Sequence, residues 1–511
     1  MTSRRLILCS LLYAAVLSLL LNSASLWTDE AFSAWLASHA TLRSLESTLL
    51  SGGSSDLQMS LYYTYLFFWA KMFGTGELAL RAANIPFILI FSFALVWASA
   101  RVFKSQWAWL APGMLPFVWH YAAEARPYMA LLALSAATLA ALLRFLIAPS
   151  HDEAKIYPWL CLVCVLVGSL FHMMFLLAAL PLLLIALLAF WADPTDTRWR
   201  LWKIPLAVFA IPFCGLAAFL LFTFRRGVTD YYYGHPGISQ MASVFYELAG
   251  FGGFGPNRKY SLDFHSHASA VAIGGLAILA GAAFAVYAAA RRKPGRTLLL
   301  LGIAACFGAA EAVALSLAIG KQFDARHLAA LVPIFLFLLM EMTRKPATRG
   351  AAALLLLGGA WLVSDLRAQF LPEYQKEDYR DAVRAVALIH AQTGADIAVA
   401  ADPAAAAYYG LDVRGPAPCF PIQYACGPAF QQVPWQYRTP AVNADHWTTD
   451  RIQEWLENHR AQGKPVAVLL RTDRSHRRDS NWWPLLTAGV PQNQLEVHGF
   501  EIVVLNGNPR S

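Results

Sequence analysis

Long apolar runs without charge alternate with short charged connections along most of this chain. The first run extends from Leu6 to Leu26 without a charged residue, which is long enough to cross the hydrocarbon core of a bilayer as a helix. Similar runs recur up to residue 364 and predict about eleven membrane-spanning helices. We expect these spans near residues 6–26, 82–100, 106–121, 127–147, 156–170, 172–191, 204–224, 268–290, 298–319, 327–343 and 350–364.

The pattern changes after residue 364, where shorter amphipathic and apolar segments follow one another. The predicted elements are helices over 377–384 and 452–459, buried strands over 395–401 and 465–470, and a terminal hairpin in which 495–497 and 501–505 flank His498-Gly499. The expected fold class is therefore mainly α. A polytopic transmembrane helical bundle occupies residues 1–364, and a small α/β domain occupies residues 365–511.

Composition supports the membrane assignment. Of the 511 residues, 58% are hydrophobic and only 14% are charged, which is too apolar for a soluble enzyme of this size. The formal net charge of +8 does not indicate a nucleic-acid partner, because residues 1–364 carry 26 Lys and Arg against 16 Asp and Glu, whereas residues 365–511 carry 14 against 16. The basic excess lies in short connections such as 291–296 and 344–349. The positive-inside rule therefore predicts a cytoplasmic amino terminus, and an odd number of spans places the tail outside.

The opposite side of the membrane then receives the unusual polar residues. Its connections are the first loop over 27–81, a corner at 120–127, the turn at His172, a long loop over 225–267 and the connection 321–327. In the first loop the adjacent carboxylates Asp29 and Glu30 follow the first span directly. They either mark the membrane exit and cap a helix, or act chemically on a substrate. The aromatic-rich segment that begins at Ser60 predicts an interfacial helix.

Cationic groups gather on this side against the usual charge bias. Arg126 follows Glu124 in the corner at 120–127, and Arg326 precedes His327 in the connection 321–327. Cations at this depth indicate that an anion binds, such as the phosphate of a lipid. The plainer alternatives remain open: a local ion pair between Glu124 and Arg126, and an interfacial role for His172. The long loop over 225–267 suits either a mobile cover or interfacial anchoring.

The seven cysteines divide into two groups. Five lie inside apolar spans, where they are expected to be inert packing residues. Cys419 and Cys426 lie in a proline-rich loop of the tail, which we place in an oxidising compartment, and we expect them to form a disulfide.

Four short motifs, taken in order, resemble those of the bacterial C-type (GT-C) glycosyltransferases, the superfamily that includes the protein O-mannosyltransferases and the lipid A aminoarabinose transferase. The motifs are Leu26-Trp27-Thr28-Asp29-Glu30-Ala31, Leu61-Tyr62-Tyr63 followed by Glu77 to Arg81, Glu124-Ala125-Arg126-Pro127-Tyr128, and Arg326 to Pro333. The likeness covers roughly residues 1–345, and Asp378-Tyr379-Arg380 matches the periplasmic tail of some members. Members usually carry His-Pro-Pro where this chain has Gln58-Met59-Ser60, which indicates an unusual acceptor or reduced activity.

The resemblance implies that a sugar is transferred, with inversion, from a polyprenyl-phosphate-linked donor to a cell-envelope glycan, lipid or protein. The reaction is expected at the periplasmic face of the bacterial inner membrane. By matching position, Asp29 is expected to be the general base and Glu30 a supporting residue. The other candidate substrate-binding residues are Asp56, Glu124, Arg126, Tyr128, His172, Lys321, Arg326 and His327.

Two other classes of function remain open from the sequence. A lipid-linked glycan flippase or transporter is one, and an oligosaccharide polymerase is the other. The absence of a two-fold hydropathy repeat with paired broken helices argues against a transporter. No cofactor and no metal site are predicted, with a divalent cation on Asp29, Glu30 and Asp56 as the alternative.

Overall fold

A computed structural model describes residues 2–51, 55–227, 244–254, 296–319, 323–343, 348–371, 377–414, 418–419, 424–425, 439–444, 447–472, 481–482 and 493–505. The chain forms two compact units. The first unit comprises residues 1–22, 58–62 and 81–375, and the second comprises residues 23–57, 63–80 and 376–511. Most of the first loop therefore belongs to the same unit as the tail.

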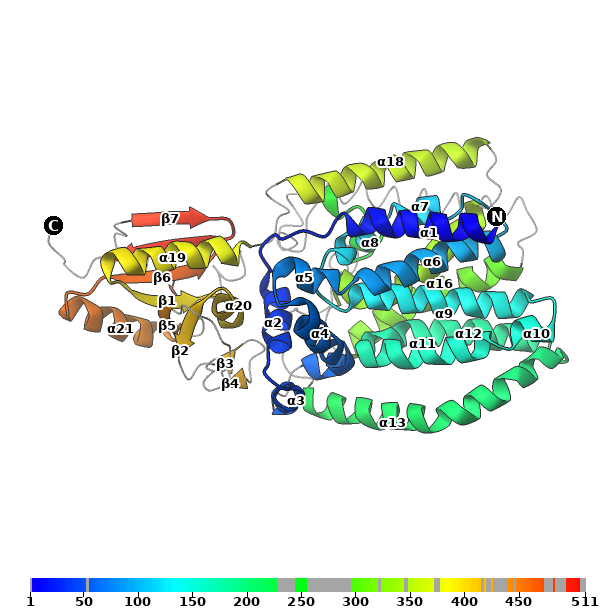
Figure 1. The fold of residues 1–511 in the computed structure, drawn as a ribbon, viewed down its shortest axis with the longest axis horizontal. Coiled ribbons are helices and arrows are strands. Elements are labelled where there is room, and N and C mark those ends of the chain that lie inside the picture. Colours follow the sequence, from blue (N-terminus) through cyan, green and yellow to red (C-terminus); the bar gives the residue numbers. More distant parts are fainter. Residues whose placement is uncertain are drawn as a thin grey trace. The chain divides into compact units, whose positions relative to one another are not determined.

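The first unit is a helical bundle (Figure 1). Its helices are α1 (Ser3–Ser18), α6 (Ile85–Arg101), α7 (Leu110–Gly113), α8 (Pro116–Ala122), α9 (Tyr128–Ile147), α10 (His151–Ala154), α11 (Tyr157–Phe171), η2 (Met173–Phe175), α12 (Leu176–Ala192), η3 (Thr197–Trp202), α13 (Lys203–Gly227), η4 (Gly252–Phe254), α16 (Arg296–Ile319), η6 (Ala325–Leu331), α17 (Val332–Thr343) and α18 (Thr348–Phe370). Within the described residues, seven helical stretches are long and apolar enough to cross a membrane. The protein is a multi-pass membrane protein.

Helix α9 is the centre of this bundle. Sixteen of its 20 residues are buried, and it packs against α6 on one side and α11 on the other (Figure 1). The Ser135 hydroxyl on α9 donates a hydrogen bond to the carbonyl of Ala330 at 2.6 Å, which ties η6 to the same centre. Helix α13 has the opposite character, because its apolar side chains Ile204, Val208 and Ile211 are exposed. Such a helix suits contact with lipid, where exposed apolar side chains carry no cost.

The expected count of about eleven spans is not confirmed. Helix α1 ends at Ser18, well before the predicted end at Leu26. The predicted span over 106–121 is wrong as a single helix, because the structure has α7 and α8 there, with Leu115 in an extended conformation between them. Pro116 follows Leu115, and a proline disfavours the helical conformation of the residue before it. The predicted span over 268–290 lies outside the described residues.

The second unit contains a six-stranded sheet in the order β2-β5-β1-β6-β8-β7. The strands are β1 (Asp396–Ala400), β2 (Leu411–Arg414), β5 (Thr439–Asn443), β6 (Val466–Arg471), β7 (Asn493–Val497) and β8 (Phe500–Leu505), and a separate pair consists of β3 (Pro418–Cys419) and β4 (Tyr424–Ala425). The first four strands of the order are parallel, and β8 pairs antiparallel with β6 and β7. The predicted helices, strands and terminal hairpin of the tail are confirmed.

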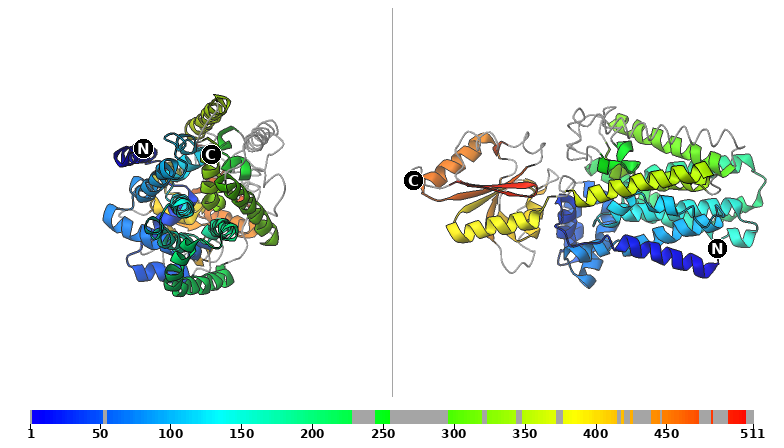
Figure 2. Two further views of the ribbon diagram at one scale, coloured as in Figure 1. Left: turned by 90° about the vertical axis from the view of Figure 1, so that its right-hand side faces the viewer. Right: turned by 90° about the horizontal axis from the view of Figure 1, so that it is seen from above.

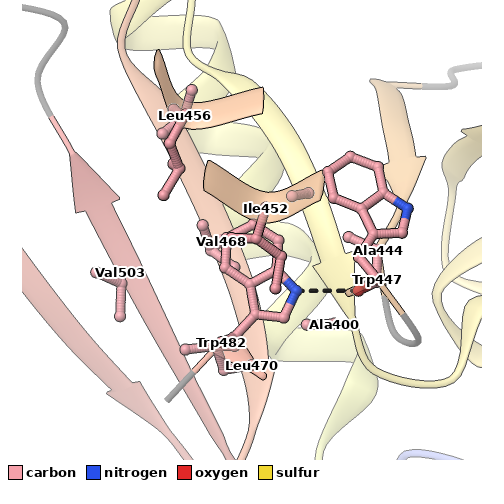
Figure 3. Packing of buried hydrophobic residues seen from close by; sticks show 11 residues of the cluster. Ala400, Ala444, Trp447, Ile452, Leu456, Val468, Leu470, Trp482 and Val503 are labelled. Atoms are coloured by element: carbon pink, nitrogen blue, oxygen red, sulfur yellow. Dashed lines mark hydrogen bonds between the residues drawn. The ribbon is translucent and has the colours of Figure 1, made fainter. Parts of the chain in front are cut away.

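Helices cover both faces of this sheet. Figure 2 shows the sheet between α19 (Tyr379–Thr393) and α21 (Thr449–Ala461). Under α21, Ile452 and Leu456 pack on Val468 and Trp482, and the Trp482 indole donates a hydrogen bond to the carbonyl of Ala444 at 2.9 Å (Figure 3). Burying the apolar indole while its N–H finds a partner lets a tryptophan sit fully inside this core.

The first loop adds helices to the second unit. These are α2 (Thr28–Ala37), α3 (Leu42–Ser51), η1 (Ser55–Met59), α4 (Ser60–Phe73) and α5 (Glu77–Ala82), although the last residues of η1 and the first of α4 belong to the first unit, as do the last two of α5. Helix α2 packs against α20 (Pro403–Tyr408) of the tail. The segment predicted to be an interfacial helix is α4.

The expected disulfide is not supported. No disulfide is present among the residues that the structure describes. Cys419 ends β3, and its predicted partner Cys426 lies outside the described residues.

Candidate functional site

The corner at 120–127 is held by a buried amide. Asn84, at the start of α6, is 1% exposed and donates hydrogen bonds to the carbonyls of Tyr121 at 3.3 Å, Ala122 at 3.2 Å and Glu124 at 2.6 Å. These carbonyls lie at or just after the end of α8, where intrahelical donors run out, and that of Glu124 also accepts a hydrogen bond from the backbone N–H of Arg126 at 2.7 Å. Asn84 therefore fixes the backbone from which Glu124 and Arg126 project.

Replacing Asn84 with leucine is expected to destabilise the protein by about 2 kcal/mol, because the carbonyls of Tyr121 and Ala122 lose the hydrogen bonds from the buried amide. The measurement is the thermal unfolding midpoint of the detergent-purified protein, which should fall by several degrees. Ser92→Ala is the matched control. Ser92 is fully buried on the same helix, but its hydroxyl has no hydrogen-bond partner in the described part of the chain. Equal midpoints for wild type and Asn84→Leu would contradict this role.

Another corner is formed by Asp324, Arg326 and His327 at the start of η6. Asp324 is the N-cap of η6, and its side chain and that of His327 form a reciprocal capping box. The carboxylate of Asp324 lies 3.3 Å from Nε of Arg326, and both residues are buried. The local sequence thus accounts for the position of the arginine at the start of a helix.

Tyr128 and His172 join the two corners. The guanidinium of Arg326 lies 6.0 Å from the ring centroid of Tyr128, within cation–π range. The Tyr128 ring is 6.1 Å from that of His172, which in turn is 6.5 Å from that of His327. We call Glu124, Arg126, Tyr128, His172, Arg326 and His327 the arginine cluster.

The two histidines of the cluster are neutral donors. Nδ1 of His172 accepts a hydrogen bond from the backbone N–H of Met174 at 3.1 Å, and Nδ1 of His327 accepts one from the N–H of Asp324 at 3.1 Å. A ring nitrogen that accepts carries no proton, so Nε2 is the protonated nitrogen in both. Burial is the largest cause that lowers the pKa of His172 well below its usual value, and the charges of Arg126 and Arg326 act in the same direction. His327 is therefore not the additional cation that its sequence position predicts.

Met59 touches the cluster directly. Its sulfur lies 4.0 Å from Nη2 of Arg126, and both side chains are buried. Met59 is part of Gln58-Met59-Ser60, where the resembled superfamily usually has His-Pro-Pro. A thioether is a weak acceptor that fits irregular gaps. The departure in the sequence thus falls on a residue in contact with a predicted substrate-binding arginine.

The three predicted carboxylates of the first loop lie in the second unit. Asp29 and Glu30 occupy the first turn of α2, where the helix dipole favours negative charge. Asp29 is half-buried and Glu30 is fully buried. Asp56 is also buried, and its Oδ1 accepts a hydrogen bond from the Tyr63 hydroxyl at 2.6 Å.

The structure brings the arginine cluster together inside the first unit, from segments that are far apart in the sequence. Asp29, Glu30 and Asp56 belong to the second unit, and Lys321 lies outside the described residues. Most of the long loop over 225–267 also lies outside them. Sequence reasoning missed Asn84. The sequence feature that could have indicated Asn84 is that it is a single amide residue at the start of an otherwise apolar run, directly before the Ile85-Pro86 pair that begins a helix.

No protein-family profile matches this chain, and no curated protein is similar to it in sequence. Similarity appears in comparisons of structure. The chain has the fold of a C-type (GT-C) membrane glycosyltransferase, as its motifs predict.

The similar solved structures include two of ArnT from Cupriavidus metallidurans. The apo structure superposes with a TM-score of 0.53 and 14% identity over 97% of each chain. The structure bound to undecaprenyl phosphate superposes with a TM-score of 0.56 and 13% identity over 98% of each chain. ArnT is the lipid A aminoarabinose transferase. At this low sequence identity, the superposition establishes that the folds are shared.

Proposed function

We propose that this protein is an inverting glycosyltransferase that moves a sugar from a polyprenyl-phosphate-linked donor to a cell-envelope acceptor. The observation that carries the proposal is the arginine cluster, in which two buried arginines from different corners lie beside two neutral histidine donors. The fold shared with ArnT, which has been solved with undecaprenyl phosphate, supports a donor of this class.

In the proposed reaction the cluster holds the phosphate of the donor. A donor phosphate brings negative charge next to two buried arginines, of which Arg326 already faces the carboxylate of Asp324. Arg126 and Arg326 can each grip phosphate oxygens with two N–H groups, and Nε2–H of His172 and His327 can add neutral hydrogen bonds. As the bond between the anomeric carbon and the phosphate oxygen breaks, its electron pair stays on the phosphate. These donors stabilise that developing charge.

Asp29 is proposed to act as the general base. The hydroxyl of the acceptor gives its proton to the Asp29 carboxylate, and the acceptor oxygen forms a bond to the anomeric carbon as the phosphate leaves. One displacement in line with the leaving group inverts the anomeric centre. Glu30 and Asp56 are proposed to support and orient the substrates.

We place the protein in the bacterial inner membrane, with the amino terminus cytoplasmic and the second unit periplasmic. The distribution of basic residues supports this orientation. Lys and Arg concentrate in the connections that alternate with the loops carrying the candidate site. The sugar acceptor, whether glycan, lipid or protein, would then be met on the periplasmic face.

The test is mass analysis of a strain that lacks the protein. We expect one sugar to disappear from a surface glycan, lipid or protein, and a polyprenyl-phosphate carrying that same sugar to accumulate. Complementation with the wild-type chain should restore both. An unchanged envelope with no accumulated lipid-linked sugar would contradict the proposal. Accumulation of a lipid carrying a whole repeat of several sugars would favour an oligosaccharide polymerase.

A further inference from the structure

The segment that leads into Asp29 has no regular structure of its own. Residues 21–27 connect α1 to α2 without helix or strand, and Trp27, the N-cap of α2, makes no side-chain capping hydrogen bond. The backbone groups of such a segment need partners from elsewhere. Where those partners come from decides how firmly the first turn of α2 is held.

Tyr409 of the tail supplies one such partner. Its hydroxyl oxygen accepts hydrogen bonds from the backbone N–H of Leu26 at 2.6 Å and from the hydroxyl of Ser25 at 3.3 Å. It donates to Oε1 of Glu77 at 3.4 Å. Burial raises the pKa of Tyr409 to about 12, so the phenol stays protonated at neutral pH and can both accept and donate. Tyr409 thus holds the chain three residues before Asp29.

Arg380 binds the same segment from α19. Its Nη1 donates to the carbonyl of Ser23 at 2.9 Å and to Oε1 of Glu77 at 3.2 Å. Its backbone N–H donates to the hydroxyl of Ser25 at 3.2 Å. Arg380 and Tyr409 therefore converge on the Glu77 carboxylate while each binds the segment before α2.

Tyr379 holds the residue next to Asp29. Its hydroxyl lies 3.2 Å from Oγ1 of Thr28, and it accepts a hydrogen bond from the backbone N–H of Asp402 at 3.3 Å. Its ring packs on Phe500, with centroids 4.5 Å apart, so the phenol is anchored to the central sheet. Thr28 and Tyr379 are both buried.

We propose that Tyr379, Arg380 and Tyr409 are positioning residues that hold the turn bearing Asp29 in its reactive orientation. This inference rests on the proposed role of Asp29 as the base. Hydrogen bonds from two separate tail segments bind residues 23–28, and α2 itself packs on α20. A displacement of about 1 Å at a reacting group can lower a rate about a hundredfold, so small losses of order here are expected to be visible in catalysis.

The test compares two neighbouring tyrosines. Tyr409→Phe removes the hydroxyl that binds Leu26, and Tyr408→Phe removes an equally short hydrogen bond, 2.6 Å, to the carbonyl of Thr75, near the other end of the same loop. We expect Tyr409→Phe to lower kcat at least about tenfold. KM for the donor should change less than about threefold, because the arginine cluster, and not this segment, is proposed to bind the donor phosphate. Tyr408→Phe should keep kcat within about twofold. Tyr379→Phe should behave like Tyr409→Phe.

Equal losses of kcat in the two variants would mean that the contacts only dock the loop, and wild-type kcat in Tyr409→Phe would remove its positioning role. Amide hydrogen exchange gives a readout that does not depend on activity. Exchange in a peptide over 24–32 should accelerate in Tyr409→Phe and stay near wild type in Tyr408→Phe. If exchange behaves this way but the wild type transfers no sugar from a polyprenyl phosphate, the proposed function fails while the structural contact stands. Unchanged exchange in Tyr409→Phe overturns the inference itself.

Discussion

Replacing Asp29 with asparagine is expected to lower the rate of sugar transfer about a hundredfold to ten-thousandfold. A positioned general base contributes an acceleration of this size, and asparagine is almost equal in shape but cannot take a proton at neutral pH. The measurement is the initial rate with a defined polyprenyl-phosphate sugar and purified protein. Asp29→Glu should retain partial activity, because the carboxylate remains although its reach changes.

The matched control for Asp29 is Glu46→Gln. Glu46 is an exposed carboxylate on α3 of the same loop, so its loss changes the net charge equally without touching the candidate base. We expect wild-type rates from this variant. Wild-type transfer by Asp29→Asn would end the assignment of the base. A flippase would be favoured if neither the wild type nor Asp29→Asn transferred sugar and both still moved lipid-linked sugar across the membrane.

The elements of the fold could largely be read from the chain, because each depends on local periodicity. Helix α9 and strand β6 are long, uniform apolar runs, and Gly394, with a φ of +70°, ends α19 in a conformation that glycine tolerates well. The predicted span over 106–121 failed for a local reason as well. Gly113 and Pro116 interrupt a mainly apolar segment whose composition is otherwise typical of a single helix.

The arrangement of the candidate site could be anticipated only in part. Charge bias predicted that Arg126 and Arg326 lie on one side, and the bundle brings both near His172. Charge bias could not predict that the backbone N–H of Asp324 fixes the neutral form of His327, because this contact depends on the geometry of a single turn. Nor does any local pattern reveal that Tyr409 binds Leu26, 383 residues away. Contacts between distant segments depend on tertiary packing, which periodicity does not encode.

Replacing Arg326 has the second large expected effect. We expect Arg326→Gln to lower kcat/KM for the donor at least about a hundredfold, and Arg326→Lys to lower it about tenfold. A lysine keeps the charge, but it binds as a point charge and loses the planar pair of N–H donors that fits a phosphate. The rates are measured at donor concentrations below KM, where a loss of phosphate binding has its full effect.

The alternative role for Arg326 is structural, as the counter-ion of the buried Asp324 carboxylate 3.3 Å away. Breaking a buried pair by removing one partner costs about 3–5 kcal/mol, so a single variant could lose activity through instability alone. The double variant Asp324→Asn/Arg326→Gln separates the two roles, because it removes both charges together. We expect it to recover much of the thermal stability lost in Arg326→Gln and to remain unable to use the donor at low concentration. Recovery of transfer in the double variant would show that Arg326 acts only as the counter-ion of Asp324. The proposal that the arginine cluster binds the donor phosphate would then be wrong.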